Sequence, residues 1–415
     1  MKLSKKTTVK VNDTESNIIG HMCYAARKLW NTCNYERHNY KELGLEKAPT
    51  WYSQKKDFKD TLWFKNLPSQ TAQEVCRVLD KSWKSFYVLK KSGGVENPNP
   101  PKYKQENLPI TYMQNGIKKD GIAIRLSVPK NLKAYMKETY DIDADFLYLK
   151  NSCFEDIENI KQLKLYPPEN GEMDVIIVYE VADAEPMEDN GKYLSIDIGV
   201  HNMMTCYSTE GPSFILGRKY FSIARKNDKE IARVQSQWSE VQSKAGVKYP
   251  KSSKHIKALH KKKKNCLNDY LHKLTHWLTE YCIAHDIHTV VLGDITGIRE
   301  DNDKGNVMNQ KLHALPYKRI HELLSYKLAM AGITFVAQNE AYSSQCSPLA
   351  PSVSKTYATK EKRVCRGLYK DGGKTWNADV VGAYNILRLY LQGKEDSSYK
   401  PSIPVDYPHI IKVAV

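Results

Sequence analysis

The chain has 415 residues, and 63 Lys and Arg against 47 Asp and Glu give it a formal net charge of +16. This length exceeds what one small core needs and predicts two or three domains. No run of about 18 apolar residues is present, which excludes a membrane-spanning helix, and no apolar run follows Met1-Lys2-Leu3 as in a signal peptide. Nine scattered cysteines indicate no disulfide framework, so we expect a cytoplasmic protein with no membrane partner.

The positive surplus favours a polyanionic partner. The 27 tyrosines add flat rings that can stack on bases. A membrane surface fits less well, because no basic amphipathic helix with bulky apolar anchors stands out. Lys and Tyr could also reflect only genome composition, but nucleic acid is the expected partner.

The first half of the chain predicts a β-rich module with helices inserted after its first strand. Helical spacing predicts helices over 18–40 and 69–91, the second starting at Pro68-Ser69 and ending at Gly93-Gly94. A Pro-rich connector covers 97–101. Alternating or apolar runs predict strands over 7–12, 110–112, 121–128, 162–165 and 175–179. Pro, Asp and Asn cluster at 185–191, where we expect a domain boundary.

The second half alternates strands with helices, which is typical of an α/β sheet covered by helices. Strands are predicted over 192–197, 205–208, 214–216, 289–292 and 333–336. Helices are predicted over 222–243, 254–285 and 317–331, and a last helix begins near Asp379.

Four carboxylates lie where predicted elements end or begin. Asp197 and Asp294 end apolar strands, Glu340 follows a third strand, and Asp379 precedes the last helix. α/β proteins place their sites at such sheet ends. Converging carboxylates repel and need a cation, and oxygen ligands select Mg²⁺ or Mn²⁺. Gly199, after Asp197, suits a close approach of substrate backbone. Each acid taken alone could instead be a turn residue or a helix cap.

Two segments carry a resemblance to a known family. Residues 195–200, Ser-Ile-Asp-Ile-Gly-Val, resemble the first RuvC motif of the TnpB family, and residues 377–387, Asn-Ala-Asp-Val-Val-Gly-Ala-Tyr-Asn-Ile-Leu, resemble the third. TnpB proteins are RNA-guided DNA nucleases encoded by insertion sequences, and they are related to type V CRISPR effectors and to Fanzor. The resemblance implies a wedge-like β-barrel domain (1–15 and 97–185), an inserted helical recognition domain (16–96) and a RuvC nuclease domain of RNase H-like fold (190–415).

The same resemblance implies Mg²⁺-dependent cleavage of DNA next to a short flanking motif, by a two-metal-ion mechanism in which Mn²⁺ can substitute. Asp197 and Asp379 are then the outer metal-binding acids. The implied partners are a guide RNA encoded near the gene and a double-stranded DNA target, bound by a monomer in a bacterial cytoplasm and at the nucleoid when on target. Base pairing would read most of the sequence.

The middle RuvC motif departs from the pattern, because Gly293 stands where most relatives have Glu. Some branches and Fanzor carry a substitute Glu before a later segment, which here is Glu340 in 340–346. Glu340 is therefore the favoured third catalytic and metal-binding acid, with Asp294 in reserve. The alternative is a nuclease-inactive, RNA-guided DNA-binding repressor. A strand-transferring transposase is less favoured, because no helix-turn-helix module is evident.

The zinc ribbon of many relatives is also incomplete. Only Cys346 and Cys365 remain at about 343–376, without near partners. A structural zinc needs four ligands, so we expect none, and a degenerate target-loading insert in its place.

Basic runs predict contacts to phosphates, although each could be only a solvated helix face. Candidate nucleic-acid-binding residues are Lys257, His260, Lys261, Lys262, Lys263 and Lys264, and also Lys81, Lys84, Lys90 and Lys91. Candidates for the flanking motif, chosen by polar type, are Tyr52 and Gln73, with Ser53, Gln54 and Ser69 beside them.

Overall fold

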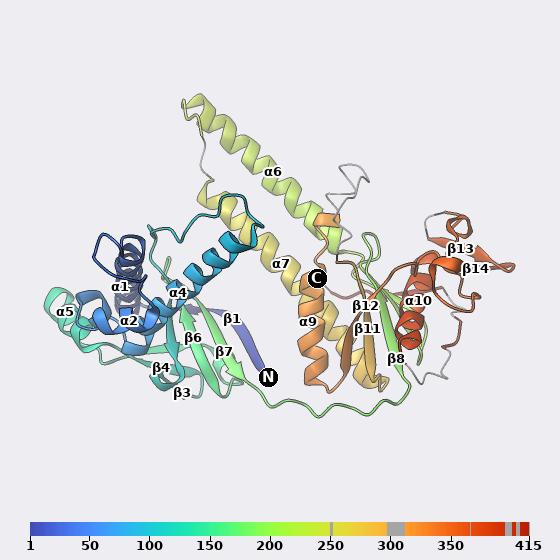
Figure 1. Ribbon diagram of the computed structural model, residues 1–415, viewed down its shortest axis with the longest axis horizontal. Helices are drawn as coiled ribbons and strands as arrows, with labels where there is room; N and C mark the ends of the chain where they lie inside the picture. The colour runs from blue at the N-terminus through green and yellow to red at the C-terminus, as the bar shows by residue number, and fades with distance from the viewer. Residues whose placement is uncertain (250–251, 297–311, 366, 395–400, 404–406, 415) are drawn as a thin grey trace. The chain divides into compact units, whose positions relative to one another are not determined.

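The computed structural model describes residues 1–249, 252–296, 312–365, 367–394, 401–403 and 407–414. The chain divides into two compact units, Met1–Ala182 and Asp183–Val415, which we describe separately (Figure 1). In the described ranges, no helix combines the length and apolar character needed to cross a bilayer.

The first unit contains two antiparallel sheets. The larger has the order β1-β7-β6-β2, and β1 (Lys2–Lys10) pairs with β7 (Glu172–Glu180) along its whole length. The others are β6 (Ile160–Leu165) and β2 (Ile110–Met113), and the second sheet holds β3 (Ile117–Asp120), β4 (Ala123–Ser127) and β5 (Phe146–Lys150). The first strand therefore pairs with the last one, and the helices between them form an insertion. The expected closure into a barrel stays a prediction.

The inserted helices pack on the larger sheet through α1 (Asp13–His38) and α4 (Ser69–Ser92). A capping box between Asn12 and Glu15 starts α1, and Gly93, with a φ of 66°, ends α4 in the left-handed conformation. Three helices were not predicted: α2 (Trp51–Asp57), α3 (Leu62–Lys65) and, outside the insertion, α5 (Lys130–Tyr140).

The second unit is built on a mixed sheet in the order β12-β11-β8-β9-β10-β15. Its strands are β8 (Tyr193–Asp197), β9 (Met204–Ser208), β10 (Phe214–Leu216), β11 (Thr289–Asp294), β12 (Thr334–Asn339) and β15 (His409–Ile410). β8, β9 and β10 are successively antiparallel, whereas β11 runs parallel to both β8 and β12.

Helices cover both faces of this sheet. Apolar side chains of α7 (Lys254–Ala284) and α9 (Tyr317–Met330) pack on the face that includes Leu194 and Leu292. Helix α10 (Ala378–Gln392) packs on the opposite face, which includes Tyr193 and Val291. Burial on both faces explains why these strands are continuous apolar runs. The predicted mixed α/β fold class is confirmed.

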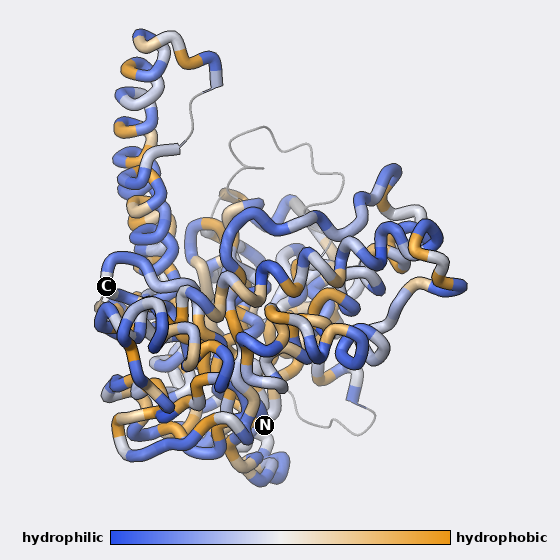
Figure 2. The backbone as a smooth tube through the Cα atoms, turned by 90° about the vertical axis from the view of Figure 1, so that its left-hand side faces the viewer, coloured by the Kyte–Doolittle hydropathy of each residue, from blue (hydrophilic) through white to orange (hydrophobic). Residues whose placement is uncertain are grey.

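Two further elements extend from this core. Helix α6 (Tyr220–Lys244) packs antiparallel on α7, forming a helical hairpin on which hydrophilic residues predominate (Figure 2). The short hairpin of β13 (Leu368–Asp371) and β14 (Lys374–Asn377) lies directly before α10. Gly372 and Gly373 form its turn with positive φ values of 53° and 71°, which glycine adopts without strain.

A buried ion pair joins the two long helices of the first unit. Arg37 of α1 donates to Asp80 of α4 at 2.9 Å, and both side chains are less than 10% exposed. The Arg37 Nε donates to Gln54 at 2.9 Å, so this network also fixes α2. Removing one partner of such a pair leaves a buried charge without compensation.

We therefore expect Asp80→Ala to lower the free energy of unfolding by about 3–5 kcal/mol, because the Arg37 guanidinium would stay buried. Urea denaturation of the full chain measures this. The control is Asp60→Ala, since Asp60 pairs with Lys65 at an exposed site and its loss should have no measurable effect. Equal stabilities of the two variants would contradict the assignment.

Candidate active site

Three of the predicted acids lie at one edge of the sheet of the second unit. Because β8, β11 and β12 are parallel, Asp197, Asp294 and Glu340 follow strand ends that point the same way. Ile196 pairs with Leu292, and Gly293 with Gln338. The sequence prediction that these carboxylates meet at a sheet edge therefore agrees with the strand register.

The fourth acid, Asp379, lies in the first turn of α10. The N-cap is Asn377, whose side-chain oxygen accepts hydrogen bonds from the backbone N–H groups of Asp379 and Val380 at 3.0 and 3.2 Å. Asp379 is thus not the helix cap, and its carboxylate is free for other contacts. One oxygen accepts from the Asn202 amide at 2.8 Å and the other pairs with Arg363 at 3.4 Å.

Asp197 lies at the end of β8, where α10 packs closely against this strand. A Cβ atom on Gly382 would lie 2.7 Å from the Asp197 Oδ2, so any side chain at position 382 would force this oxygen to move. The pKa of Asp197 is raised well above its usual range by burial of the carboxyl group and then by the charges of Glu340 and Asp379, while Arg363 acts in the opposite direction. Asp197 is therefore an electrostatic neighbour of both Glu340 and Asp379.

Glu340 occupies the space that a side chain at position 293 would fill. A Cβ atom on Gly293 would lie 2.7 Å from the Glu340 Oε2. This oxygen is buried and has no hydrogen-bond partner within the described part of the chain. Burial and then the charge of Asp294 raise the pKa of Glu340 to about 7. An unpaired buried carboxylate oxygen is costly, which indicates a missing partner of positive charge.

Asp294 behaves as a turn residue. Its Oδ1 accepts hydrogen bonds from the backbone and hydroxyl of Thr296, the backbone bond at 2.8 Å, and from the Tyr317 hydroxyl at 3.0 Å. Burial acts to raise the pKa of Asp294, but these hydrogen bonds outweigh it and the pKa is lowered. The carboxylate is thus engaged in holding the start of α9.

The donor set suits a hard divalent cation, because it consists of carboxylate oxygens and includes the unpaired Glu340 Oε2. The side chains are near enough to repel, but within the described ranges no three acidic, His or Cys side chains converge on a single ion position. Ligation would therefore require side-chain rotation at this edge, and the assignment of Asp197, Glu340 and Asp379 stays a prediction.

Three supporting residues were not found by sequence reasoning. Asn202 and Arg363 contact Asp379. Both residues lie in loops, and no local sequence pattern predicts where these loops are placed. Gly382 could have been noticed as a glycine inside a helix. Gly199 has a different reason from the predicted one: a Cβ atom there would lie 2.9 Å from the Asn202 carbonyl oxygen, so a tight turn of the chain itself requires glycine.

The predicted insert at 343–376 is tied to α10 by polar side chains. The buried Asn385 amide donates to the carbonyls of Ser343 and Cys346, both at 2.8 Å. Arg388 donates to the carbonyls of Ser347, at 3.2 Å, and of Ala350. Cys346 is buried and Cys365 is exposed. Hydrogen bonds thus hold this segment on α10.

The predicted basic face of α7 is largely exposed. Lys257, His260, Lys261, Lys262 and Lys264 are exposed, whereas Lys263 pairs with Asp228 of α6. Lys263 is seven residues after the buried Ile256, so both face α6. Lys263 is therefore removed from the candidates for phosphate contact, and the five exposed residues remain.

In the first unit, the candidates differ in availability. Lys81, Lys90 and Lys91 are exposed, while Lys84 pairs with the buried Asp80 at 3.0 Å. Tyr52 is 58% exposed. Gln73 donates to Ser69 at 3.2 Å and lines a cavity of about 410 Å³ with Arg77 and Gln114. Gln54 is fully buried, so its suggested contact to a flanking motif is wrong.

Comparisons with known proteins find similarity over most of the chain. The family model OrfB_IS605, "Probable transposase", matches residues 176–299, and the Cas12f1-like TNB domain model matches residues 317–386. A relative in Escherichia coli (strain K12), "Putative RNA-guided DNA endonuclease InsQ", is 24% identical over 365 residues, which are 85% of this chain and 82% of the relative.

Solved structures show the same fold at low identity. Cas12f1, in its complex with sgRNA and target DNA, has a TM-score of 0.58 at 15% identity, covering 89% of this chain and 82% of its own. The mini-RNA-guided endonuclease CRISPR-Cas_phi3 has a TM-score of 0.51 at 11% identity, covering 96% and 93%. These similarities agree with the family resemblance of the two sequence motifs.

The polar attachment of the insert can be tested by Asn385→Ala. We expect a loss of about 1–3 kcal/mol in the free energy of unfolding, because two buried carbonyls lose their donor. We also expect faster proteolysis within 343–350. Asn227→Ala is the control, since Asn227 bonds only a carbonyl of its own helix. An unchanged stability for Asn385→Ala would show that the insert does not depend on the hydrogen bonds of Asn385.

Proposed function

We propose that the chain is a TnpB-type protein, an RNA-guided DNA endonuclease that hydrolyses phosphodiester bonds at the edge of the six-stranded sheet of the second unit. The observation that carries the proposal is the position of Glu340. Its carboxylate fills the space left by Gly293, beside Asp197, so a third acid is present although the usual glutamate is not.

Asp197, Glu340 and Asp379 would hold Mg²⁺, with Mn²⁺ as a substitute. Two such ions would supply an activated water and stabilise the leaving oxygen. The residues of the chain prepare this arrangement. Asn202 bonds one oxygen of Asp379, Gly382 lets α10 approach Asp197, and the sheet edge brings Glu340 near Asp197.

The proposed partners are a guide RNA encoded near the gene and a double-stranded DNA target, bound by a monomer. The relative InsQ is described as RNA-guided, and Cas12f1 has been solved with sgRNA and target DNA. The exposed Lys257, Lys261 and Lys264 share one face of α7 at helical spacing, which suits a phosphate backbone.

The flanking DNA motif would be read in the first unit. Tyr52 is exposed at α2, and Gln73 lies on α4 at the wall of the 410 Å³ cavity. Glutamine can bond adenine with both its amide donor and its acceptor, and Ser69 orients the Gln73 amide. The exposed Lys90 and Lys91 would contact the guide–target duplex without reading sequence.

We expect Glu340→Ala to lower the cleavage rate by at least about 10²-fold and Asp294→Ala to retain most activity, because Asp294 only holds a turn. The double variant Gly293→Glu/Glu340→Gly should recover part of the loss, because the new side chain enters the vacated space. Single-turnover cleavage of plasmid DNA by the purified ribonucleoprotein measures all three rates.

Asp197→Ala is the inactive reference, and it should still bind guide and target. Full cleavage by Glu340→Ala would exclude Glu340 as the third acid. Cleavage by Asp197→Ala would contradict the whole site.

The flanking motif can be tested with the RNA that copurifies with the chain and a target library with a randomised flank. We expect Gln73→Ala to relax preference at one flank position by about tenfold, because one bidentate base contact is worth about 1–3 kcal/mol. Lys91→Ala is the matched control and should weaken binding about equally for all flanks. An unchanged flank preference in Gln73→Ala would exclude Gln73 from readout.

A further inference from the structure

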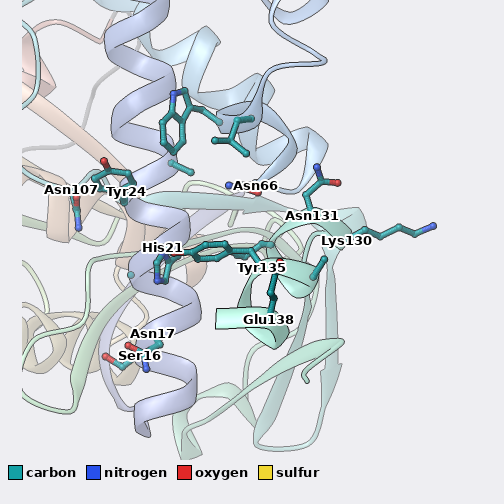
Figure 3. A pocket seen from close by; sticks show the side chains of 16 residues that line it. Ser16, Asn17, His21, Tyr24, Asn66, Asn107, Lys130, Asn131, Tyr135 and Glu138 are labelled. Carbon is teal, nitrogen blue, oxygen red and sulfur yellow. The ribbon is translucent and has the colours of Figure 1, made fainter. Parts of the chain in front are cut away.

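A cavity of about 970 Å³ opens in the first unit between α1, α3 and α5. Its volume lies within the range of about 300–1,000 Å³ that small-ligand sites occupy. The wall combines aromatic rings with the amides of Asn17, Asn66, Asn107 and Asn131 (Figure 3). We call this the amide cavity. None of the residues proposed above for cleavage or for the flanking motif lines it.

A glycine in the middle of a long helix leaves the wall of the amide cavity open. Gly20 lies inside the 26-residue α1, where glycine costs about 1 kcal/mol relative to alanine. Neither its backbone nor its neighbours require glycine, because its φ is not positive and a Cβ atom there would meet nothing within 4 Å. The empty space beside Gly20 therefore suits a molecule that approaches α1 closely.

The aromatic side chains form two groups at this wall. His21 lies 5.4 Å from Tyr135, and Tyr24 lies 5.6 Å from Trp63, both pairs edge to face. Lys28 lies over the rings of Tyr24 and Trp63, at 5.4 and 5.8 Å. Rings with an adjacent cation are the surfaces on which unpaired bases stack next to their phosphates.

The polar groups of the wall are mostly neutral. The four asparagine amides make no side-chain hydrogen bond to any residue that the structure describes, so each can donate and accept toward a ligand. Burial lowers the pKa of His21, so its ring is also an uncharged donor and acceptor. Lys130 and Glu138 carry the only charges among the described lining residues. This chemistry matches the edge of a nucleobase better than a bare phosphate.

We propose that the amide cavity receives an unpaired base from the constant part of the guide RNA. The proposal rests on the proposed function, because it assumes a guide. Base edges of a duplex are presented in its grooves and cannot enter a cavity, whereas unpaired RNA bases are commonly turned out, stacked on rings and bonded along their edges.

The choice of RNA over the displaced DNA strand follows from what differs between targets. A wall of amides discriminates between bases. The displaced strand changes with every target, so such a reader there would restrict targeting. A guide changes from target to target only in the segment that pairs with DNA. A segment of the guide outside that pairing can stay the same in every complex, and a base-selective site can bind it without that cost.

The test measures binding of the full chain to its guide RNA in the absence of target DNA. The copurified RNA is sequenced and then made by chemical synthesis, with each unpaired nucleotide replaced in turn by an abasic one. We expect one abasic position to weaken binding to the wild-type chain about tenfold, because stacking of one base is worth about 1–3 kcal/mol. Gly20→Leu, which fills the open space, should weaken the intact guide similarly and be insensitive to that abasic position.

Two variants separate binding from folding. Gly20→Ala should raise the melting temperature, because glycine is lost from a helix, and should still weaken guide binding. Asn131→Asp replaces an amide by a charge and should weaken binding, whereas Asn99→Asp makes the same change on the connector, outside the cavity, and should not.

If all abasic positions affect wild type and Gly20→Leu equally, the proposal is overturned. A preference of the cavity for single-stranded DNA, lost in Gly20→Leu, would overturn it in favour of the displaced strand. Absence of any specific copurifying RNA would instead contradict the proposed function itself.

Discussion

Burial and mutual repulsion of carboxylates are the constraint on the edge of the sheet in the second unit. Burial is the larger cost of ionising Asp197 and Glu340. Repulsion adds to it, since Asp197 lies near Glu340 and Asp379, and Glu340 lies near Asp294. A fold tolerates this only if rigid elements hold the groups together and a cation offsets the charge. The parallel strands β8, β11 and β12 supply the first condition, and Arg363 supplies part of the second.

The relation between Gly293 and Glu340 illustrates that the proposed active site depends on positions in space and not on positions in the sequence. Adjacent parallel strands are about 4.8 Å apart, so a side chain from the end of β12 can reach over β11. Where β11 carries glycine, that space is free, and the Glu340 carboxylate occupies it. A motif that is degenerate in the sequence can therefore be completed in three dimensions, as we propose for Glu340.

Periodicity was sufficient to predict the long helices and most strands of the two larger sheets, since each buries a regular apolar face. The strands β3, β5 and β15 were not predicted. The short α2, α3 and α5 escaped prediction because few residues carry their pattern. Asp294 and Glu340 were indistinguishable as strand-end acids until hydrogen bonds to Thr296 and Tyr317 identified the turn residue. The polar side chain of Gln54 suggested a surface contact, but it is buried and donates to the Cys33 carbonyl and the Glu36 carboxylate.

The polar attachment of the insert has a mechanical consequence for the site. Asn385 is six residues after Asp379 on α10, a rise of about 9 Å, and its amide holds the loop at 343–346. Arg363, in the same insert, pairs with Asp379. One helix thus carries an acid of the cluster at its start and the anchor of the opposing cation further along. Because helices are stiff over this length, α10 sets the distance between Asp379 and the loop at 343–346, from which the rest of the insert continues toward Arg363.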